Sequence, residues 1–492
     1  LGKPGMFLLL LLSILVVQVL NITLNEDYFV SYVKQYPVKS ISPCEDFFAH
    51  ACSAVPENDL SSAFKRKQIE AMFNPEDYVN EKAAKLSVFL KQSSSINEDN
   101  SADVAYMEKR VRSYCFQNRK QCRKYATALK ANALSVNVSL NYEGIIKTLT
   151  KSLQKVATWA PVLRQQCWQT FYLITLTNAF IRALEDPKNQ EAKKKFDSSQ
   201  LKIREAFDQV KEVYLRRIEA SPWVHDRKLL EHYKTIEHVE FRNHIWNSVA
   251  QEYFDVFFPV FENCERSKFD WYKDELFLCA KLAIEVAEVK TNLPLFYQIG
   301  VTANAGYANS QVVIAPEFVP VMESNAISAF AVINFVVGHE LGHHIFQPIV
   351  TNVPTLMPEA IQCLKEHRAH VCDTASPKCW SGYMTAGEDA PDVVALDIMT
   401  EMFKELKGGM EIDSSIDMSK EQFFFYSMTA NWCTPSPTRS VLDVHSPHKE
   451  RINSLLMHSK FFHETFECKK GDKMWQDPKN FCNLLGPESH RK

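Results

Sequence analysis

The chain has 492 residues, a formal net charge of −3 and 46% hydrophobic residues. This charge, with no block of basic residues, argues against a nucleic-acid-binding protein, and the hydrophobic content is ample for a buried core. The length favours two or three domains, and the low glycine count of 13 is expected of a mostly helical chain.

An apolar run at residues 6–20, MFLLLLLSILVVQVL, predicts export. We assign residues 1–24 to a signal peptide or to an uncleaved anchor that would hold the protein in a membrane. Thirteen cysteines indicate an oxidising compartment and disulfide bonds, and the odd count leaves at least one thiol unpaired or intermolecular. The sequons at Asn21 and Asn137 are compatible with glycosylation there. We expect an extracellular protein, either secreted or anchored at the cell surface as a single-pass type II membrane protein.

Charged, amphipathic helical patterns fill the chain from about residue 61 to residue 290. Examples lie at residues 106–123, 145–157 and 201–218. Residues 310–319, SQVVIAPEFV, instead alternate and are rich in β-branched residues, which predicts a strand. The fold class is therefore expected to be mainly α with a small β-sheet (α+β).

Residues 331–346, AVINFVVGHELGHHIF, predict one helix that carries an H-E-x-x-H pattern. Because His339 and His343 are four residues apart, they lie on one helical face and their imidazoles can reach one metal ion. Glu340 sits about 100° round the helix from His339, where it can reach a water on that metal. These three side chains are the smallest set for hydrolysing a peptide with zinc.

The surroundings of the pattern distinguish it from a chance match on a polar surface helix. An apolar run that includes Phe335 and Val336 precedes it and predicts burial in a core. Burying two histidines and a glutamate without a partner is costly, and a metal supplies that partner. Gly342 lies inside the helix, where glycine costs about 1 kcal/mol relative to alanine, so we expect close backbone packing there.

The third ligand is expected to be a carboxylate from a later helix, with the fourth position open for water. A metzincin is excluded because Ile349 stands where its third histidine would be. The downstream candidates are Glu359, Glu366 and Glu388. Asp392, four residues after Glu388, would supply the second carboxylate that holds the ring N–H of a ligand histidine.

Two features of this later segment leave other interpretations open. Glu388 and Asp392 could simply form an acidic first turn favoured by the helix dipole. Pro391 would be tolerated in a first turn and would disrupt a helix interior, so a helix capped by Asp389 would leave Glu388 just before it.

Five segments together resemble the neprilysin family of zinc endopeptidases, which includes the endothelin-converting enzymes. In the order of the family they are SPCEDFFAHACS at residues 42–53, NAGYANSQVVIAP at 304–316, VVGHELGHH at 336–344, GEDAPD at 387–392 and DVHSPHKERIN at 443–453. The resemblance implies a gluzincin-type zincin catalytic domain at residues 291–492 and a second, helical lid domain at 76–290 that is shorter than the family's. It also implies that residues 25–75 pack on the catalytic domain.

The resemblance also implies a set of site residues, beginning with one Zn²⁺ per chain on His339, His343 and Glu388. Glu340 would be the general base, Asp392 would orient a ligand histidine, and His445 would stabilise the oxyanion. Asn304, Ala305 and Arg451 would bind the substrate backbone. A candidate lining for an apolar side-chain pocket is Phe335, Val336 and Trp432, for which plain core packing is the alternative.

The resemblance further suggests three disulfides, which are Cys44 with Cys468, Cys52 with Cys433, and Cys363 with Cys482. We therefore predict a zinc-dependent endopeptidase that cleaves extracellular oligopeptides on the amino side of hydrophobic residues. The competing interpretation is a catalytically inactive neprilysin-like ectodomain that acts as a binding module. An intracellular aminopeptidase of similar zinc chemistry is disfavoured by the leader and the cysteines.

Overall fold

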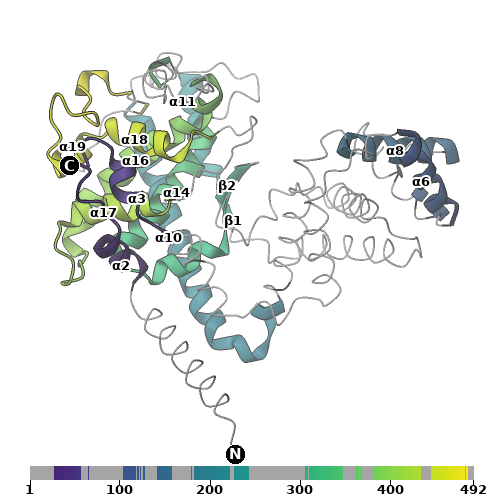
Figure 1. Ribbon diagram of the computed structural model, residues 1–492, viewed down its shortest axis with the longest axis horizontal. Helices are drawn as coiled ribbons and strands as arrows, with labels where there is room; N and C mark the ends of the chain where they lie inside the picture. Colours follow the sequence, from purple (N-terminus) through teal and green to yellow (C-terminus); the bar gives the residue numbers. More distant parts are fainter. Residues whose placement is uncertain are drawn as a thin grey trace, which may run out of the picture.

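The structure is a computed structural model in which helices dominate and one small sheet is present (Figure 1). The described residues are 27–56, 65, 104–117, 119–120, 122–123, 126–127, 141–157, 179, 182–221, 227–242, 305–308, 310–346, 362–364, 366, 382–433, 445–482 and 484–485. The apolar leader, Asn21, Asn137 and Asn304 lie outside these ranges. Within them, no helix combines the length and the apolarity that crossing a membrane requires.

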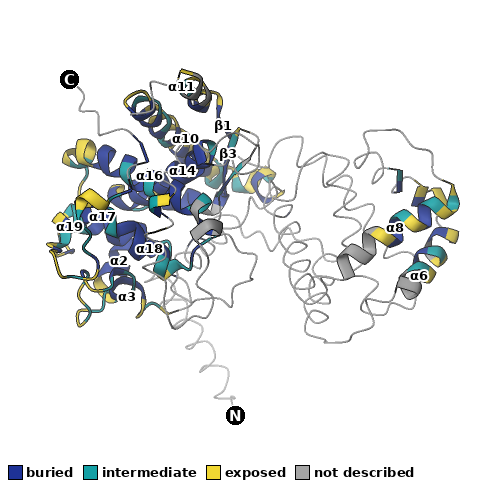
Figure 2. Cartoon of the chain, turned by 90° about the horizontal axis from the view of Figure 1, so that it is seen from above, coloured by how far each residue is buried: buried dark blue, intermediate teal, exposed yellow. Residues whose placement is uncertain are grey.

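Two long helices, α14 (Ala326–Phe346) and α16 (Gly382–Leu406), form the centre of the fold. α14 is buried along nearly its whole length, as expected of a helix that is apolar on most sides. α10 (Gln190–Glu219) and α17 (Lys420–Ala430) also pack against α14. Figure 2 shows the buried residues gathered on this group of helices.

Small residues bring α14 and α16 close together. A Cβ built on Gly338 would lie 3.0 Å from the Cβ of Ala395, and one built on Gly342 would lie 2.8 Å from the Cα of Pro391. Residues four apart on a helix share a face, so the two glycines of α14 meet Pro391 and Ala395 of α16 along one seam. The seam accounts for a glycine inside a helix, because a larger residue would hold the two backbones apart.

α16 runs through Pro391 instead of starting beside it. The helix begins at Gly382, so the interpretation in which Asp389 caps it is wrong, and Glu388 and Asp392 both lie within the helix. An interior proline removes one backbone hydrogen bond and normally disfavours this arrangement. Here Pro391 occupies the close contact with Gly342, and tertiary packing outweighs the local preference.

The sheet has three described strands in the order β1-β3-β2. β3 (Gln311–Ile314) pairs parallel with β1 (Glu240–Arg242) and antiparallel with β2 (Ala305–Ala308). The strand predicted at residues 310–319 is therefore shorter than expected, because Pro316 has no N–H for a ladder and opens the 3₁₀ helix η8 (Pro316–Glu323). β3 is the central strand of the three, so β1 and β2 are the outer strands.

α10 connects the middle of the chain to the central helices. The 3₁₀ helix η4 (Pro187–Asn189) precedes it, and α11 (Arg227–Lys234), η6 (Thr235–His238) and β1 follow. Tyr214 Oη donates to the carbonyl of Gly338 at 2.7 Å, and Arg217 forms a buried ion pair with Glu401 of α16 at 2.8 Å. Residues 190–221 and 227–242, which the resemblance places in a lid domain, thus pack with elements that it places in the catalytic domain, because the apolar stripe of α10 needs a core to cover it.

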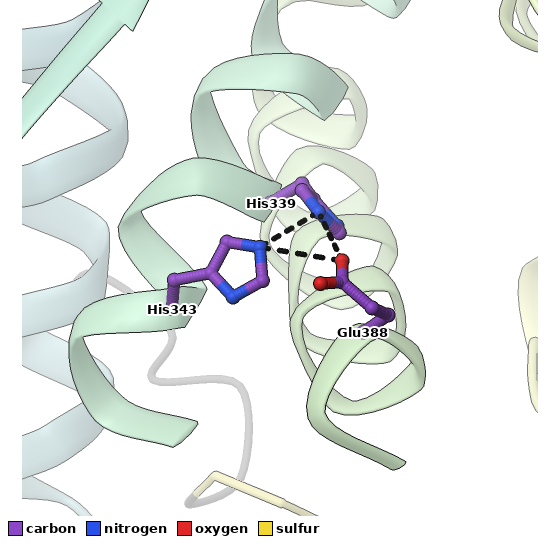
Figure 3. A group of neighbouring side chains, drawn as sticks. All are labelled: His339, His343 and Glu388. Carbon is purple, nitrogen blue, oxygen red and sulfur yellow. Dashed lines mark hydrogen bonds and ion pairs between the residues drawn. The ribbon is translucent and has the colours of Figure 1, made fainter. Parts of the chain in front are cut away.

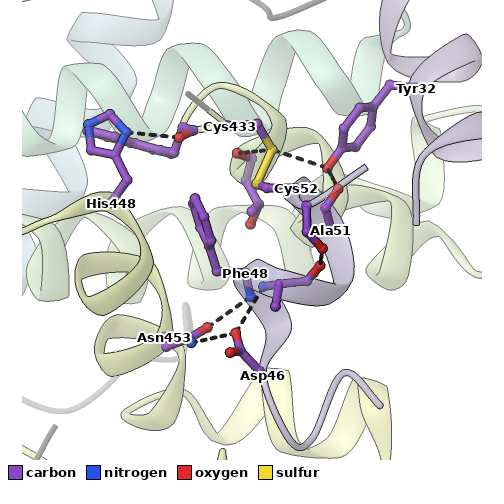
Figure 4. The surroundings of a disulfide bond; sticks show 12 residues. Tyr32, Asp46, Phe48, Ala51, Cys52, Cys433, His448 and Asn453 are labelled. Atoms are coloured by element: carbon purple, nitrogen blue, oxygen red, sulfur yellow. Dashed lines mark hydrogen bonds between the residues drawn. A yellow bond between two sulfur atoms is a disulfide. The ribbon is translucent and has the colours of Figure 1, made fainter. Parts of the chain in front are cut away.

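The N-terminal segment packs on the C-terminal helices. α2 (Tyr28–Gln35) and α3 (Phe47–Cys52) contact α17, and α3 also contacts α18 (His448–Met457), where Phe48 N donates to Asn453 Oδ1 at 2.9 Å (Figure 4). The disulfides are Cys44–Cys468, which lies just beyond α19 (Lys460–Phe466), Cys52–Cys433 and Cys363–Cys482, the same pairs that the resemblance implies. Two short 3₁₀ helices, η10 (Lys407–Gly409) and η11 (Pro478–Asn480), complete this region.

α6 (Val104–Gln117) and α8 (Tyr142–Ala157) pack against each other, away from the other labelled elements (Figure 1). Arg112 of α6 pairs with Glu143 of α8 at 2.6 Å. A fourth disulfide, Cys115–Cys122, closes a short loop at the end of α6. The sequence did not predict this pair, because spacing alone does not fix disulfide connectivity.

Candidate metal centre

Three side chains from α14 and α16 converge on one point (Figure 3). His339 Nε2 lies 3.1 Å from His343 Nε2, and Glu388 Oε2 lies 3.3 Å from the former and 3.4 Å from the latter. A tetrahedral zinc with bonds of 2.0–2.1 Å would separate its ligand atoms by roughly 3.3 Å. The three atoms therefore have the spacing of three corners of a zinc tetrahedron.

Glu388 gives the clearest sign that a cation fits this site. Its Oε2 is buried and lies 3.3–3.4 Å from imidazole nitrogens of His339, His343 and His445, but no residue within the described ranges gives it a well-aligned hydrogen bond. A buried carboxylate oxygen without a hydrogen bond is costly unless a positive charge satisfies it. Two histidines and a glutamate with a fourth position open are also a known ligand set of catalytic zinc. The residues present thus fit the metal that the sequence predicts.

The outer nitrogen of His339 is held by a carboxylate. Asp392 Oδ1 lies 2.8 Å from His339 Nδ1, which places the ring proton on Nδ1 and leaves Nε2 free to bind a metal. Asp392 in turn accepts two hydrogen bonds from Arg451, from Nε to Oδ2 at 2.5 Å and from Nη2 to Oδ1 at 2.7 Å. All three side chains are buried, so the chain of contacts fixes the orientation of the imidazole.

The electrostatics of the site favour positive charge at its centre. Burial lowers the pKa of His339, but the adjacent Asp392 carboxylate outweighs this and raises it to about 10. Burial raises the pKa of Glu388, but the facing imidazoles of His339 and His343 hold it well below its usual range. Without a metal, His339 therefore carries a second proton on Nε2, and a bound cation would take the place of that proton beside Glu388.

Glu340 occupies the position expected of a base beside these ligands. It is buried in α14 and interacts electrostatically with His339, His343 and Glu388. Burial raises the pKa of its carboxyl, which makes it a better proton acceptor than an exposed glutamate. Its burial and pKa therefore suit a group that takes a proton and returns it.

His445 approaches the same carboxylate from the segment before α18. Its Nε2 lies 3.3 Å from Glu388 Oε2, and its side chain is 44% exposed, so one side of the imidazole faces solvent. The next residue anchors this segment to α16, because Ser446 Oγ donates to the buried carboxylate of Asp389 at 3.1 Å. Sequence reasoning missed this anchor, since nothing local pairs Ser446 with a residue 57 positions away.

An aromatic wall lies next to the Arg451–Asp392 pair. The guanidinium of Arg451 stacks over the Trp432 ring at 4.2 Å, and Trp432 meets the buried Phe335 edge to face with ring centroids 6.0 Å apart. Val336, the next residue along α14, is buried as well. Arg451 is only 3% exposed, so its predicted bond to a substrate carbonyl remains a prediction, as does the apolar pocket.

Other sequence candidates fall elsewhere or outside the described residues. Glu366 lies on the surface and accepts a hydrogen bond from Gln362 at 2.9 Å, which leaves Glu388 as the described carboxylate at the site. Glu359 and Asn304 are outside the described ranges, and Ala305 is the first residue of β2. His344, next to a proposed ligand, bonds residues that sequence reasoning did not connect with it.

Comparison with known proteins agrees with the resemblance to zinc endopeptidases. Residues 311–482 match the model of peptidase family M13. The Kell blood group glycoprotein of Homo sapiens is 29% identical over 164 residues, which cover 32% of this chain and 22% of that protein. Neprilysin-1 of Caenorhabditis elegans is 30% identical over 126 residues, which cover 24% of this chain and 17% of that protein. The matched segments thus span less than a quarter of the length of these relatives.

Two solved structures share the fold. A Haemonchus galactose-containing glycoprotein complex superposes with a TM-score of 0.55 at 14% identity, covering 91% of this chain and 97% of that one. The Mycobacterium tuberculosis zinc metalloprotease ZMP1, solved in complex with an inhibitor, gives a TM-score of 0.50 at 12% identity and covers 92% of this chain and 98% of that one. At such low identity the likeness speaks for the architecture alone.

Proposed function

Because residues 311–482 match peptidase family M13, we propose that the chain is a member of this family, the neprilysin family, and a zinc-dependent endopeptidase that cleaves extracellular oligopeptides on the amino side of hydrophobic residues. The observation that carries the proposal is the triangle of His339, His343 and Glu388 donor atoms, 3.1–3.4 Å apart. Four disulfides within the described part of the chain support action outside the cell, where such bonds persist.

In this proposal His339, His343 and Glu388 hold one Zn²⁺, which when bound polarises the scissile carbonyl and acidifies a water. Glu340 accepts the proton of the attacking water and passes it to the leaving amine. His445 donates from Nε2 to the oxyanion, and its approach to Glu388 supports this role. Asp392 keeps His339 in the tautomer that leaves Nε2 free.

Substrate binding is proposed for the outer strand β2 and the aromatic wall. An extended peptide would add to β2 antiparallel, with Asn304 and Ala305 holding its backbone. Phe335, Val336 and Trp432 would receive the apolar side chain after the scissile bond. We assign the helical lid to the part of the chain around α6 and α8. The elements from α10 to β1 are assigned to the catalytic body, because α10 packs on α14 and β1 pairs with β3.

The test uses the purified protein with and without added zinc. Metal analysis should give one zinc per chain, and a mixed peptide library should be cut internally before hydrophobic residues, with all cleavage lost on adding a zinc chelator. Glu340→Gln should retain the zinc and lose turnover, because the amide cannot accept a proton.

Other outcomes would change the assignment. Zinc binding without cleavage of any peptide would favour the inactive binding module. Cleavage confined to the first residue of each peptide would make the protein an aminopeptidase. Fewer than about 0.1 zinc ions bound per chain at micromolar zinc would exclude the proposed metal centre.

A further inference from the structure

His344 directly follows the proposed ligand His343 but makes a different set of contacts. Neighbouring residues of a helix point about 100° apart, so His344 leaves α14 toward the sheet. Its Nδ1 is hydrogen-bonded to Tyr307 Oη at 2.7 Å, and its Nε2 is hydrogen-bonded to Thr235 Oγ1 at 2.9 Å. Both ring nitrogens thus have a hydroxyl partner, and the imidazole links β2 to η6.

The two partners of His344 come from opposite sides of the sheet. Tyr307 lies in β2, one of the two outer strands, where it pairs with Val312 of β3. Thr235 opens η6, which leads into β1 at the other side. The Tyr307 ring also meets the imidazole edge to face with centroids 5.8 Å apart. One side chain therefore ties the surroundings of both outer strands to the end of α14.

The position of this tie matters because β2 is short. It has four residues and pairs with β3 alone among the described strands, so its ladder gives it little resistance to sliding or tilting. A peptide that added to β2 would take its register from that strand. A displacement of about 1 Å between substrate and metal is enough to cost an enzyme roughly a hundredfold in rate.

We propose that His344 is a positioning residue that holds the outer strand β2 at a fixed place relative to the metal centre. Through its bond to Tyr307, His344 fixes the position of β2 and hence of an extended peptide paired with it. Because His344 adjoins His343 in α14, that position is fixed relative to the metal ligands. The proposal rests on the proposed function and adds a substrate class to it, namely peptides long enough to pair along β2. Peptides that span little more than the scissile bond would not use the tie.

The test compares His344→Phe and Tyr307→Phe with the parent protein. The first keeps a flat ring and removes both hydrogen bonds, and the second removes a single hydroxyl. Tyr426→Phe is the matched control, since Tyr426 Oη of α17 makes the same kind of bond, at 2.6 Å, to His50 Nε2 of α3. All are assayed on an eight-residue peptide and on a blocked peptide with one residue on each side of the scissile bond.

For the long peptide we expect KM to rise about tenfold in His344→Phe, which loses two neutral hydrogen bonds. In Tyr307→Phe, which loses one, we expect a rise of about threefold. For the short peptide kcat/KM should change less than twofold, and zinc content should stay at one per chain. Tyr426→Phe should lower the melting temperature without changing KM for either peptide.

Binding of the long peptide, measured by fluorescence anisotropy in a Glu340→Gln background, repeats the test without turnover. A parent protein that binds both peptides and cuts neither would end the proposed function while leaving this comparison intact. The positioning role is overturned if His344→Phe loses zinc, if both peptides weaken equally, or if neither changes.

Discussion

The replacement Gly342→Ala would test whether the seam between α14 and α16 sets the spacing of the metal ligands. The added Cβ would lie 2.8 Å from Pro391 Cα and 3.1 Å from Tyr214 Oη, whereas ordinary contact begins at 3.4 Å. The helices must therefore separate by about 3.4 − 2.8 = 0.6 Å at this point, because the contacted atom belongs to the backbone and cannot rotate away.

The expected effect on stability is the difference between two terms. Overpacking in a core costs about 1–3 kcal/mol, and alanine recovers about 1 kcal/mol of helix propensity. Since the overlap is with backbone, we expect the free energy of unfolding of the metal-free protein to fall by about 1–2 kcal/mol. The matched control is Gly408→Ala in η10, where a Cβ meets nothing within 4 Å and the change should stay within about 0.5 kcal/mol.

The effect on the metal should be larger than the effect on stability. Glu388 lies one turn before Pro391 on α16, so the separation moves it away from His339 and His343. Metal–ligand distances tolerate only about 0.2 Å, and zinc affinity should fall at least tenfold. Chemical denaturation and competition with a chromogenic zinc chelator give the two quantities. A variant as stable as the control and with unchanged zinc affinity would refute the idea that the seam positions the ligands.

Three further changes probe the surroundings of the site. Asp392→Asn should lower zinc affinity about 10–100-fold, because the carboxylate that orients His339 is lost. It should also destabilise the protein by about 3–5 kcal/mol, because the buried Arg451 charge is left unpaired. Zinc affinity equal to that of the parent in chelator competition would contradict the first expectation. Replacing Cys52 and Cys433 together by serine should cost about 2–5 kcal/mol in chemical denaturation, and an unchanged midpoint would mean that the bond adds nothing. Burial lowers the pKa of His463 below 6.5, so its stabilising neutral form is present above pH 6.5 and is lost as the pH falls through the lowered pKa. Melting temperatures between pH 8 and pH 5 should therefore fall less steeply in His463→Gln than in the parent, and parallel curves would exclude this residue as the cause.

The sequence predicts best what depends on neighbours along the chain. The H-E-x-x-H spacing places His339 and His343 on one face of any helix, and the apolar run before them predicts the burial of α14. Even so, the helix starts at Ala326 and not at the residue 331 expected, because helix ends depend on caps and packing as well as on periodicity.

What the sequence does not predict depends on tertiary contacts. Local rules put Pro391 in a first turn, and only the facing Gly342 shows why it lies inside α16. Strand order is similarly non-local, so the pattern at residues 310–319 predicts a strand but does not indicate that β3 lies between β1 and β2. The choice between Glu388 and Glu366 as third ligand also depends on tertiary structure, which shows that Glu388 is the carboxylate that reaches the histidines.

The disulfides between the N-terminal segment and the C-terminal helices have a consequence for how the protein would survive damage. Cys44–Cys468 and Cys52–Cys433 bridge 424 and 381 positions, so nearly the whole chain forms a covalent loop between them. One proteolytic nick anywhere from residue 53 to residue 432 would open that loop without releasing a fragment. On a non-reducing gel the nicked molecule would keep its full mass, and only a reducing agent would reveal the two pieces.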